Sequence, residues 1–314
     1  MAYSFWRSSH YEQWLMEKPD IQRGRAEDLK IYTEEEYQKI MIFFSNMLHA
    51  IAQDPSSTGN NYRIRMQVVA TACVYFKRFY LRRSFKDVDP FLMAPTCLLL
   101  AAKVEEFGTL STNKLSSAVN GYVKKFPFLS VDLSPLRVGI MHEAEFILLE
   151  ILDCCLIVFQ PYRPLKQLFQ DLRESNTIKE LDTLEAAAVK IINDSIRTDL
   201  SLLYAPHIIA IGCFQLAMMF NQREKDFATW FAELNVDYDK VLDVVNTMTA
   251  LYKKWQSVED NGVLKGLIDK LPKVNPNPPP PSHHLQAQQQ QQQHMLQQQQ
   301  QARLQQQHQQ QRYQ

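Results

Sequence analysis

A cluster of charges ends an otherwise apolar stretch of the sequence. Residues 91–102 carry no charge, and Lys103, Glu105 and Glu106 follow them shortly before Gly108. Because glycine suits the left-handed position just past a helix end, we expect the charged residues to lie in the last turn of a helix. Carboxylates in that turn face the negative pole of the helix dipole, which costs about 0.3 to 1 kcal/mol each at low salt. The pattern indicates that something other than the helix requires these two acids.

Two interpretations of this charged helix end (residues 103–107) are open. Lys103 and Glu106 stand one turn apart, so they would form a surface ion pair, which contributes only about 0.3 kcal/mol. That pair leaves Glu105 unexplained. A docking surface for a basic partner explains both acids, because opposite charges across an interface favour association. The stretch alone does not decide between the two.

No catalytic or metal-binding motif is complete in this sequence. His142 and Glu143 begin a zinc-protease pattern, but Phe146 stands where the second histidine ligand is needed. The eight glycines form neither a dinucleotide fingerprint nor a phosphate-binding loop. We therefore expect an interaction protein rather than an enzyme, with no cofactor and no metal.

The charge distribution argues against a large nucleic-acid footprint. The segment from Pro272 onward carries three basic residues and no acid, so residues 1–271 hold 31 bases against 34 acids. Sequence-independent binding to nucleic acid needs a clustered basic surface, and this body is slightly acidic. We expect no direct nucleic-acid partner. One basic run is predicted to be a solvated helix end, namely Arg78, Arg82, Arg83 and Lys86.

Cysteine usage and the N-terminal residues are typical of an intracellular protein. Each of the five cysteines lies in an apolar stretch and none forms a CxxC pair, so we expect them to be reduced and buried. Arg7 and Glu12 stand where a secretion signal needs an apolar core. Residues 202–220 are uncharged, but Pro206 restarts the helix and leaves about 22 Å of the roughly 30 Å needed to cross a bilayer. We expect no membrane partner.

Helical periodicity covers nearly all of the sequence before Pro272. The patterns at 9–12 and 33–36 read as capping boxes, and no long stretch alternates with the period of a strand. The predicted fold class is therefore all-α. We expect helices near residues 9–18, 33–53, 63–82, 90–106, 111–124 and 135–152, followed by a second set near 161–174, 181–198, 206–221, 226–234 and 238–256.

The second set of helices repeats the first. Residues 90–101 and 206–217 share proline, alanine, cysteine, leucine and alanine at matching positions. The match breaks at residues 103–106, because the second copy carries the uncharged residues 219–222 instead. We expect a duplicated bundle of about five helices, of which only the first copy has the charged helix end.

A duplicated five-helix bundle whose third helix ends in Ala-Lys-Val-Glu-Glu resembles the two cyclin boxes of the cyclin family. The likeness extends over about residues 6–255. Within that family the chain is most similar to the cyclin C branch. The strings that carry this likeness are SSHYEQW, IFF at 42–44, VYFKRFY at 74–80, MAPTC at 93–97, KVEEFG, DCCLIV at 153–158, PYRPL at 161–165, RTDL at 197–200 and WFAEL at 230–234.

The resemblance implies a domain order and a function. It implies an N-terminal arm and helix over 1–32, cyclin boxes over 33–156 and 157–258, and a C-terminal extension over 259–314. The extension is Pro/Gln-rich and is expected to be disordered from about residue 273. The implied function is that of a non-catalytic, nuclear regulatory subunit. It would bind and activate a cyclin-dependent kinase of the Mediator kinase module and so regulate RNA polymerase II transcription.

The resemblance also assigns a kinase-binding site. In cyclins, a lysine and a glutamate at the end of the third helix meet the regulatory helix of the kinase together with a glutamate on the fifth helix. The matching positions here are Lys103, Glu106 and Glu145. The full predicted kinase-binding set adds the neighbours Val104, Glu105 and Phe107.

Other subunits of the Mediator kinase module are implied as further partners. On the predicted helix 181–198, the face opposite the apolar stripe is polar and contains Lys190, Asn193, Asp194 and Arg197. One interpretation is a solvated face held by ion pairs of Asp194 with Lys190 and Arg197. The other is a groove for a module subunit, made by Asn193, Asp194 and Arg197, with Trp6 as an aromatic anchor.

Two other classes of protein remain as alternatives. A DNA-binding core of the general transcription factor B type also uses two cyclin-like repeats, but it needs a strongly basic second repeat. A peptide-binding helical scaffold without a kinase is the third reading. Residues 39–43 lack the Met-Arg-Ala-Ile-Leu sequence with which mitotic cyclins dock substrates, so we expect no docking of that kind.

Overall fold

The structure is a computed structural model that describes residues 4–54, 63–129, 131, 133, 136, 138–175, 180–258 and 261–272. Within these residues the regular secondary structure is helical and no strand is present, which confirms the predicted all-α class. The glutamine-rich tail, for which we expect disorder, lies outside the described residues.

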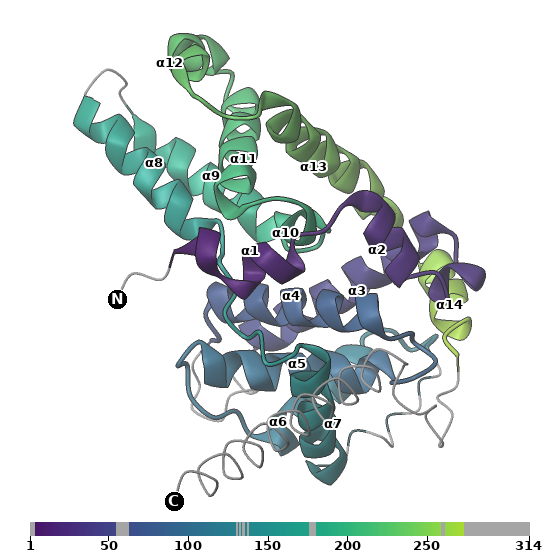
Figure 1. Ribbon diagram of the computed structural model, residues 1–314. Coiled ribbons are helices and arrows are strands. Elements are labelled where there is room, and N and C mark those ends of the chain that lie inside the picture. Colours follow the sequence, from purple (N-terminus) through teal and green to yellow (C-terminus); the bar gives the residue numbers. More distant parts are fainter. Residues whose placement is uncertain are drawn as a thin grey trace, which may run out of the picture. The chain divides into compact units, whose positions relative to one another are not determined.

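Two helical bundles make up the described chain (Figure 1). The N-terminal arm contains η1 (Phe5–Arg7), α1 (Ser9–Trp14), α2 (Lys18–Gly24) and η2 (Asp28–Lys30). The first bundle contains α3 (Glu34–Gln53), α4 (Met66–Arg82), α5 (Pro90–Val104), α6 (Thr112–Val123) and α7 (Val138–Ile151). The second contains α8 (Tyr162–Ser175), α9 (Leu181–Ser195), α10 (Leu200–Leu203), α11 (Pro206–Phe220), η4 (Glu224–Phe227), α12 (Ala228–Glu233) and α13 (Tyr238–Val258), and α14 (Asn261–Asp269) follows it.

The central helices of the two bundles are α5 and α11. Each has 15 residues and begins with a proline, Pro90 or Pro206, in agreement with the repeat predicted from the sequence. Helix α5 packs against α3, α4, α6 and α7, and α11 packs against α8, α9 and α13. Both helices are apolar on nearly all sides, which is the pattern of a helix surrounded by others.

Side-chain caps fix where two of the early helices begin. Thr33 accepts a hydrogen bond from the Glu36 N–H at 3.2 Å, and the Glu36 carboxylate accepts one from the Thr33 N–H at 3.0 Å, which confirms the second capping box. The first predicted box was wrong by one residue. Ser8 caps α1 by accepting from the Tyr11 N–H, because Ser8 has the extended backbone of a cap whereas Ser9 is already helical.

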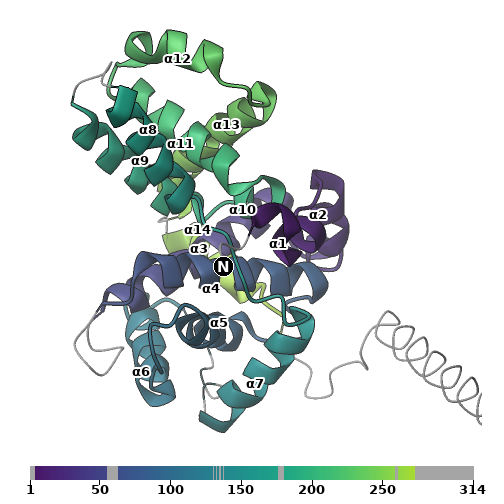
Figure 2. The same ribbon diagram turned by 60° about the vertical axis from the view of Figure 1, so that its left-hand side comes forward.

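Three helices, α2, α10 and α14, fall outside the predicted ranges. Helix α10 has only four residues, too few to show a helical period. In α2 only Ile21 is buried, so the segment has almost no apolar periodicity to read. Helix α14 packs against α3 and α13, and Figure 2 shows it next to α3. It buries Leu264, Leu267 and Ile268. Their i, i+3, i+4 spacing is a helical signal in the sequence, but the predicted domain order places residues 259–272 in the extension.

Polar contacts from the first bundle hold the segment that precedes α11. The Lys77 ammonium on α4 is buried and donates to the carbonyl oxygens of Ile196, at 2.6 Å, and Thr198. The Met16 N–H of the arm donates to the Leu202 carbonyl at 2.8 Å. These bonds tie the first bundle to the segment between α9 and α10, and the arm to α10, which lies beside α1 in both views (Figures 1 and 2).

Two expectations about burial are corrected by the structure. Cys154 is exposed and Cys155 is half-buried, because both follow the end of α7 in a turn rather than on a packed helix face; Cys73, Cys97 and Cys213 are buried as expected. Arg78 is also fully buried instead of solvated. Its guanidinium lies over the Trp14 ring and donates to the Cys155 carbonyl, so the arm covers part of the predicted basic run.

Candidate functional site

The charged helix end has a different geometry from the one the sequence predicts. Helix α5 ends at Val104, so Glu105 and Glu106 follow the helix instead of occupying its last turn. Glu106 takes the left-handed conformation with φ 51°, and Gly108 also has positive φ, at 119°. The backbone leaves the helix one turn before the glycine because Glu106 itself adopts the left-handed position.

Lys103 pairs with α7 rather than with Glu106. Its ammonium donates to both carboxylate oxygens of Glu145, at 2.6 and 2.7 Å, across the contact between α5 and α7. The Lys103 side chain is 39% exposed and that of Glu145 only 11%, so the pair presents the cation outward. Glu106 is exposed, and its carboxylate forms no hydrogen bond or ion pair with the rest of the described chain. The Lys103–Glu106 ion pair of the first interpretation is therefore wrong. Glu106 stays available to a partner, as the docking interpretation requires.

Glu105 has partners inside the protein, which the sequence analysis did not find. Its carboxylate accepts hydrogen bonds from the Thr71 hydroxyl and the Gln67 amide of α4, each at 2.6 Å. Thr71 in turn accepts from the Gln160 amide at 3.1 Å. These contacts anchor the charged helix end to α4, so a basic partner is not needed to explain this acid. The donors stand more than 30 residues away, and no local spacing reveals them.

Exposed apolar side chains adjoin the Lys103–Glu145 pair on α7. Phe146 is 74% exposed, and Ile140 and Ile147 are also largely exposed. Phe107 packs partly against the first core and lies under the Arg65 guanidinium. Large exposed apolar side chains rimmed by charge are typical of a protein-binding surface. Sequence reasoning noticed Phe146 only as a missing metal ligand.

The second predicted surface is mostly internal. Arg197 is buried, and its guanidinium donates to Asn46 of α3 at 2.6 Å and lies over the Trp255 ring. It also donates to the Asn193 carbonyl and to the Asp194 carboxylate, the latter at 3.3 Å. The solvated-face interpretation is therefore wrong for Arg197, although its predicted ion pair with Asp194 is present.

The two remaining residues of that face are half-buried and hydrogen-bonded. Asp194 accepts from the Tyr252 hydroxyl at 3.0 Å, not from Lys190, which is exposed. Burial raises the pKa of Asp194 even though Arg197 opposes the shift. The Asn193 side-chain oxygen accepts from the Tyr162 hydroxyl at 2.8 Å.

Trp6 lies in a separate groove of about 460 Å³, here called the Trp6 groove. Its walls come from η1, the linker before α8, the start of α8, the start of α11 and Gln67 of α4. Tyr162 lines this groove and also binds Asn193, so it connects the two parts of the predicted second surface. Within the described residues, Trp6 forms no hydrogen bond or ring contact with Asn193, Asp194 or Arg197.

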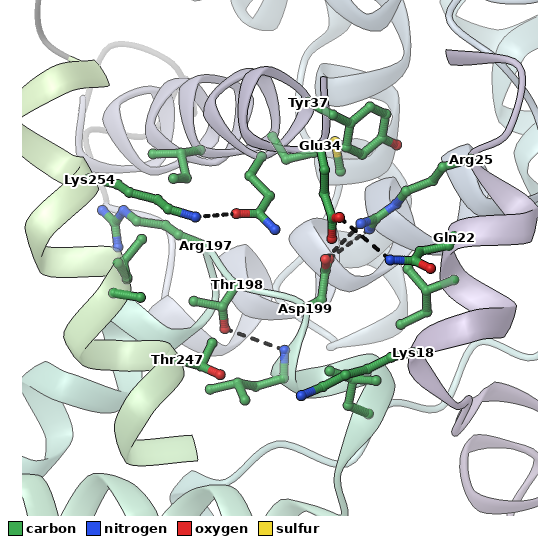
Figure 3. Close-up of a pocket in the computed structure, with 18 of the residues that line it drawn as sticks. Lys18, Gln22, Arg25, Glu34, Tyr37, Arg197, Thr198, Asp199, Thr247 and Lys254 are labelled. Carbon is green, nitrogen blue, oxygen red and sulfur yellow. Dashed lines mark hydrogen bonds and ion pairs between the residues drawn. The ribbon is translucent and has the colours of Figure 1, made fainter. Parts of the chain in front are cut away.

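A further cavity of about 310 Å³ lies between α2, α3, α13 and residues 197–203 (Figure 3). Arg25 and Asp199 point toward one another there and form two hydrogen bonds of 2.7 Å each. Burial alone would raise the pKa of Asp199, but the Arg25 charge and its hydrogen bonds hold that pKa below its usual value. Lys254 of α13 donates to Gln38 of α3 at 2.7 Å. The Arg25–Asp199 ion pair joins the second bundle to the arm, and the Lys254–Gln38 hydrogen bond joins it to α3.

Membrane-spanning helices and metal-binding clusters are both absent from the residues that the structure describes. No helix there is both long and apolar enough to cross a membrane. No group of three or more histidine, cysteine, aspartate or glutamate side chains is arranged to hold a metal ion among these residues.

Solved structures share the fold. A chain of the CAK complex from Chaetomium thermophilum bound to ATP-gamma-S superposes with a TM-score of 0.65 at 19% identity, covering 91% of this chain and 94% of that chain. A chain of the yeast TFIIK (Kin28/Ccl1/Tfb3) complex gives a TM-score of 0.57 at 22% identity, covering 79% of this chain and 99% of that chain.

Family models and curated relatives give the identity at the level of family. The model of the cyclin N-terminal domain matches residues 56–138, and that of the cyclin C-terminal domain matches residues 160–253. Cyclin-C of Drosophila melanogaster is 47% identical over 279 residues, covering 88% of this chain and 99% of that protein. Cyclin-C of Rattus norvegicus is 44% identical, covering 88% and 93%, and that of Caenorhabditis elegans is 40% identical, covering 88% and 95%. Two helical bundles, both domain matches and this degree of identity place the chain in the cyclin family, among the cyclin C proteins.

Proposed function

We propose that this chain binds and activates a cyclin-dependent kinase of the Mediator kinase module in the nucleus and so regulates RNA polymerase II transcription. As a cyclin, the chain is a regulatory subunit of a protein kinase and not itself the catalyst. The observation that carries the proposal is the outward-facing Lys103 held by Glu145, next to the unpaired Glu106 carboxylate. A mixed-charge surface of this kind suits the regulatory helix of a kinase.

The mechanism follows from what a protein kinase needs. A kinase holds ATP productively only when its strand lysine pairs with the glutamate of its regulatory helix. A cyclin that binds this helix in its inward position populates the active state, because the ligand that prefers one state shifts the equilibrium toward it. Binding energy at the charged helix end is thereby converted into kinase activity.

The geometry supports this role in two ways. Glu145 is nearly buried and orients Lys103 before any partner arrives, so little side-chain entropy remains to be lost on binding. Phe146 and Ile147 supply apolar area beside the charges, and such area carries much of the energy of an interface. The charges then fix orientation and partner choice.

The test compares a single charge reversal with a charge swap. We expect Lys103→Glu to weaken kinase binding about a hundredfold, since like charges across an interface cost several kcal/mol. The double variant Lys103→Glu with Glu145→Lys restores the internal ion pair with reversed polarity. We expect it to regain stability but not kinase binding, measured by calorimetry on the purified pair and by kinase activity.

The control for that experiment is Lys190→Glu, which makes the same charge change on an exposed side chain of α9. It should leave kinase binding unchanged. Recovery of binding by the charge swap would mean that the pair only holds α5 to α7, and the proposed kinase contact through Lys103 would then be wrong.

A second partner surface, for another subunit of the Mediator kinase module, remains part of the proposal. It combines the Trp6 groove with Asn193 and Asp194, which Tyr162 links. Arg197 acts there as a positioning residue, because it is buried against Asp194 and Asn46. This assignment is supported by the exposed Trp6 ring and the cavity around it, and by the resemblance to cyclin C.

Trp6→Ala and Asn193→Ala test the second surface in a reconstituted module. We expect both to bind the kinase normally and to recruit the other subunits at least tenfold less well. Asp194→Ala is a poor probe, because it leaves the Arg197 charge buried without its carboxylate and should destabilise the fold. Normal assembly of the module with both variants would reject the surface.

A further inference from the structure

The aromatic side chains of the Trp6 groove are held in fixed positions although one of them is exposed. Trp6 is 55% exposed, yet its ring packs against Phe5 at 5.2 Å, Tyr11 at 5.0 Å and His207 at 5.6 Å between ring centres. Phe159 and Tyr162 from the linker and α8 line the same cavity. Aromatic side chains held in this way can bind the apolar rings of a ligand without losing side-chain entropy.

Hydrogen-bond donors at the groove have no partner in the protein. The Trp6 indole N–H and the Arg163 guanidinium line the groove and form no hydrogen bond with the described chain. The amides of Gln67 and Gln160, which also line the groove, already donate to Glu105 and Thr71. The groove therefore offers aromatic faces and free donors, which suit a ligand rich in hydrogen-bond acceptors.

Proline-rich chain in the extended polyproline conformation has this chemistry. Its pyrrolidine rings are compact and apolar, its proline residues lack N–H groups, and its carbonyl oxygens make no internal hydrogen bonds. Aromatic-lined grooves bind such segments with little entropic cost. An α-helix, in contrast, uses its backbone carbonyls internally and would leave the Trp6 indole N–H without a backbone acceptor.

We propose that the Trp6 groove binds a proline-rich, extended segment of a partner protein, with an acidic residue of that segment against Arg163. The rings of Trp6, Phe159 and Tyr162 contact the proline side chains, and the Trp6 indole N–H donates to a carbonyl oxygen of the ligand. The inference rests on the proposed second partner surface and names the chemistry of its ligand.

The probe is a synthetic decaproline peptide with one central glutamate, titrated into the full chain by calorimetry. We expect a dissociation constant in the micromolar to sub-millimolar range. A peptide with alanine in place of proline should bind at least tenfold more weakly, because it loses the rings and the preformed conformation. Decaproline without the glutamate should bind several-fold more weakly.

Variants locate the peptide in the groove. Trp6→Ala should weaken binding at least tenfold, and Trp6→Phe should have an intermediate effect, since it keeps a ring and loses the N–H. Arg163→Ala should abolish the preference for the glutamate-bearing peptide. The matched control is Phe220→Ala, which removes a ring that is 62% exposed at the end of α11, outside the groove, and should change nothing.

Three outcomes would overturn the inference: no binding at millimolar peptide, equal binding of the proline and alanine peptides, or unchanged binding by Trp6→Ala. Thermal melting of each variant shows that the fold is kept. The proposed function is judged separately by recruitment of the module subunits. Loss of recruitment in Trp6→Ala without any peptide binding would sink the ligand chemistry and leave the second surface intact.

Discussion

His10 shows how a single buried side chain sets a pH dependence. Its Nδ1 accepts a hydrogen bond from the Phe159 N–H at 3.0 Å, so the proton of the neutral ring lies on Nε2, which faces the Ser201 carbonyl at 3.4 Å. Burial, and then the charge of Arg78, lower the pKa of His10 from 6.5 to about 3. The folded protein therefore holds this histidine in its neutral form.

The sign of the effect follows from proton uptake. Below pH 6.5 the unfolded chain protonates His10 and the folded chain does not until about pH 3, so the free energy of unfolding falls as the pH drops. The loss is about 1.4 kcal/mol per pH unit, or about 2 kcal/mol between pH 6.5 and pH 5. Above pH 6.5 the contribution is constant.

Urea unfolding of His10→Gln isolates this contribution from that of other titrating groups. Glutamine keeps one acceptor and one donor and does not titrate. We expect the variant to lose less stability than the unchanged protein between pH 6.5 and pH 5, by about 2 kcal/mol. Equal slopes in the two proteins would show that His10 does not resist protonation.

Residue identities at the candidate site were predictable only in part. The resemblance to cyclins pointed to Lys103 and Glu145, which the structure brings together across 42 residues of chain. Spacing alone suggested Glu106 as the partner, because only neighbours on one helix can be seen in a sequence. The contact of Thr71 with Glu105, and the exposure of Phe146, depend on how α4, α5 and α7 pack, and no local pattern encodes that packing.

At the scale of helices, α11 and α13 approach each other closely at Gly212. A Cβ atom added there would lie 2.5 Å from a methyl carbon of Val244 and 2.7 Å from its Cβ. Real Cβ atoms do not come so near, so α11 and α13 pack at a distance that only glycine permits. The matching position of the first bundle is Thr96, whose hydroxyl donates to the Leu92 carbonyl.

Gly212→Ala should therefore lower the free energy of unfolding by about 1 to 3 kcal/mol, the usual cost of overpacking a core. Gly121→Ala is the matched control on α6. Nothing lies within 4 Å of an added Cβ there, and alanine favours helix over glycine, so we expect a gain of about 0.5 to 1 kcal/mol. Chemical denaturation measures the free energy of unfolding of both variants. An unchanged value for Gly212→Ala would show that α11 and α13 can move apart at little cost.

The helices themselves were largely predictable. The helical periods, the cap at Thr33 and the prolines that open α5 and α11 placed most elements within a few residues. Helix α2 escaped notice because Ile21 is its only buried residue, and α14 because its apolar positions follow the last predicted helix closely. The packing partners of α14 could not be predicted from local sequence, because one of them, α3, is distant in the chain and only α13 is a neighbour.

At the scale of the whole molecule, α14 ties the end of the second bundle back to the first. Leu264, Leu267 and Ile268 are part of the first bundle's core, and the Tyr32 hydroxyl donates to the Leu267 carbonyl at 3.3 Å. The Lys270 ammonium pairs with Glu36 at 2.6 Å. The folded body therefore extends beyond α13.

Leu267→Ala should destabilise the protein by about 2 to 5 kcal/mol, the range for a leucine removed from a packed core. Val263→Ala, on the exposed side of the same helix, should cost much less.

Removing residues 275–314 should leave the melting temperature unchanged, because a proline- and glutamine-rich tract has little apolar surface to bury. A melting temperature several degrees lower after that removal would contradict this view of the tail.

The hydrogen bonds around Glu105 join two surfaces that are far apart in the sequence. Gln67 and Gln160 line the Trp6 groove, and both reach the charged helix end, Gln67 directly and Gln160 through Thr71. A groove ligand that draws either amide away from Glu105 changes the free energy of the conformation that meets the kinase. Thermodynamic linkage then requires reciprocity: whatever factor the ligand imposes on kinase affinity, the kinase imposes on the ligand. Binding at the groove and binding at the charged helix end would in that case be coupled, because both shift the same conformational equilibrium.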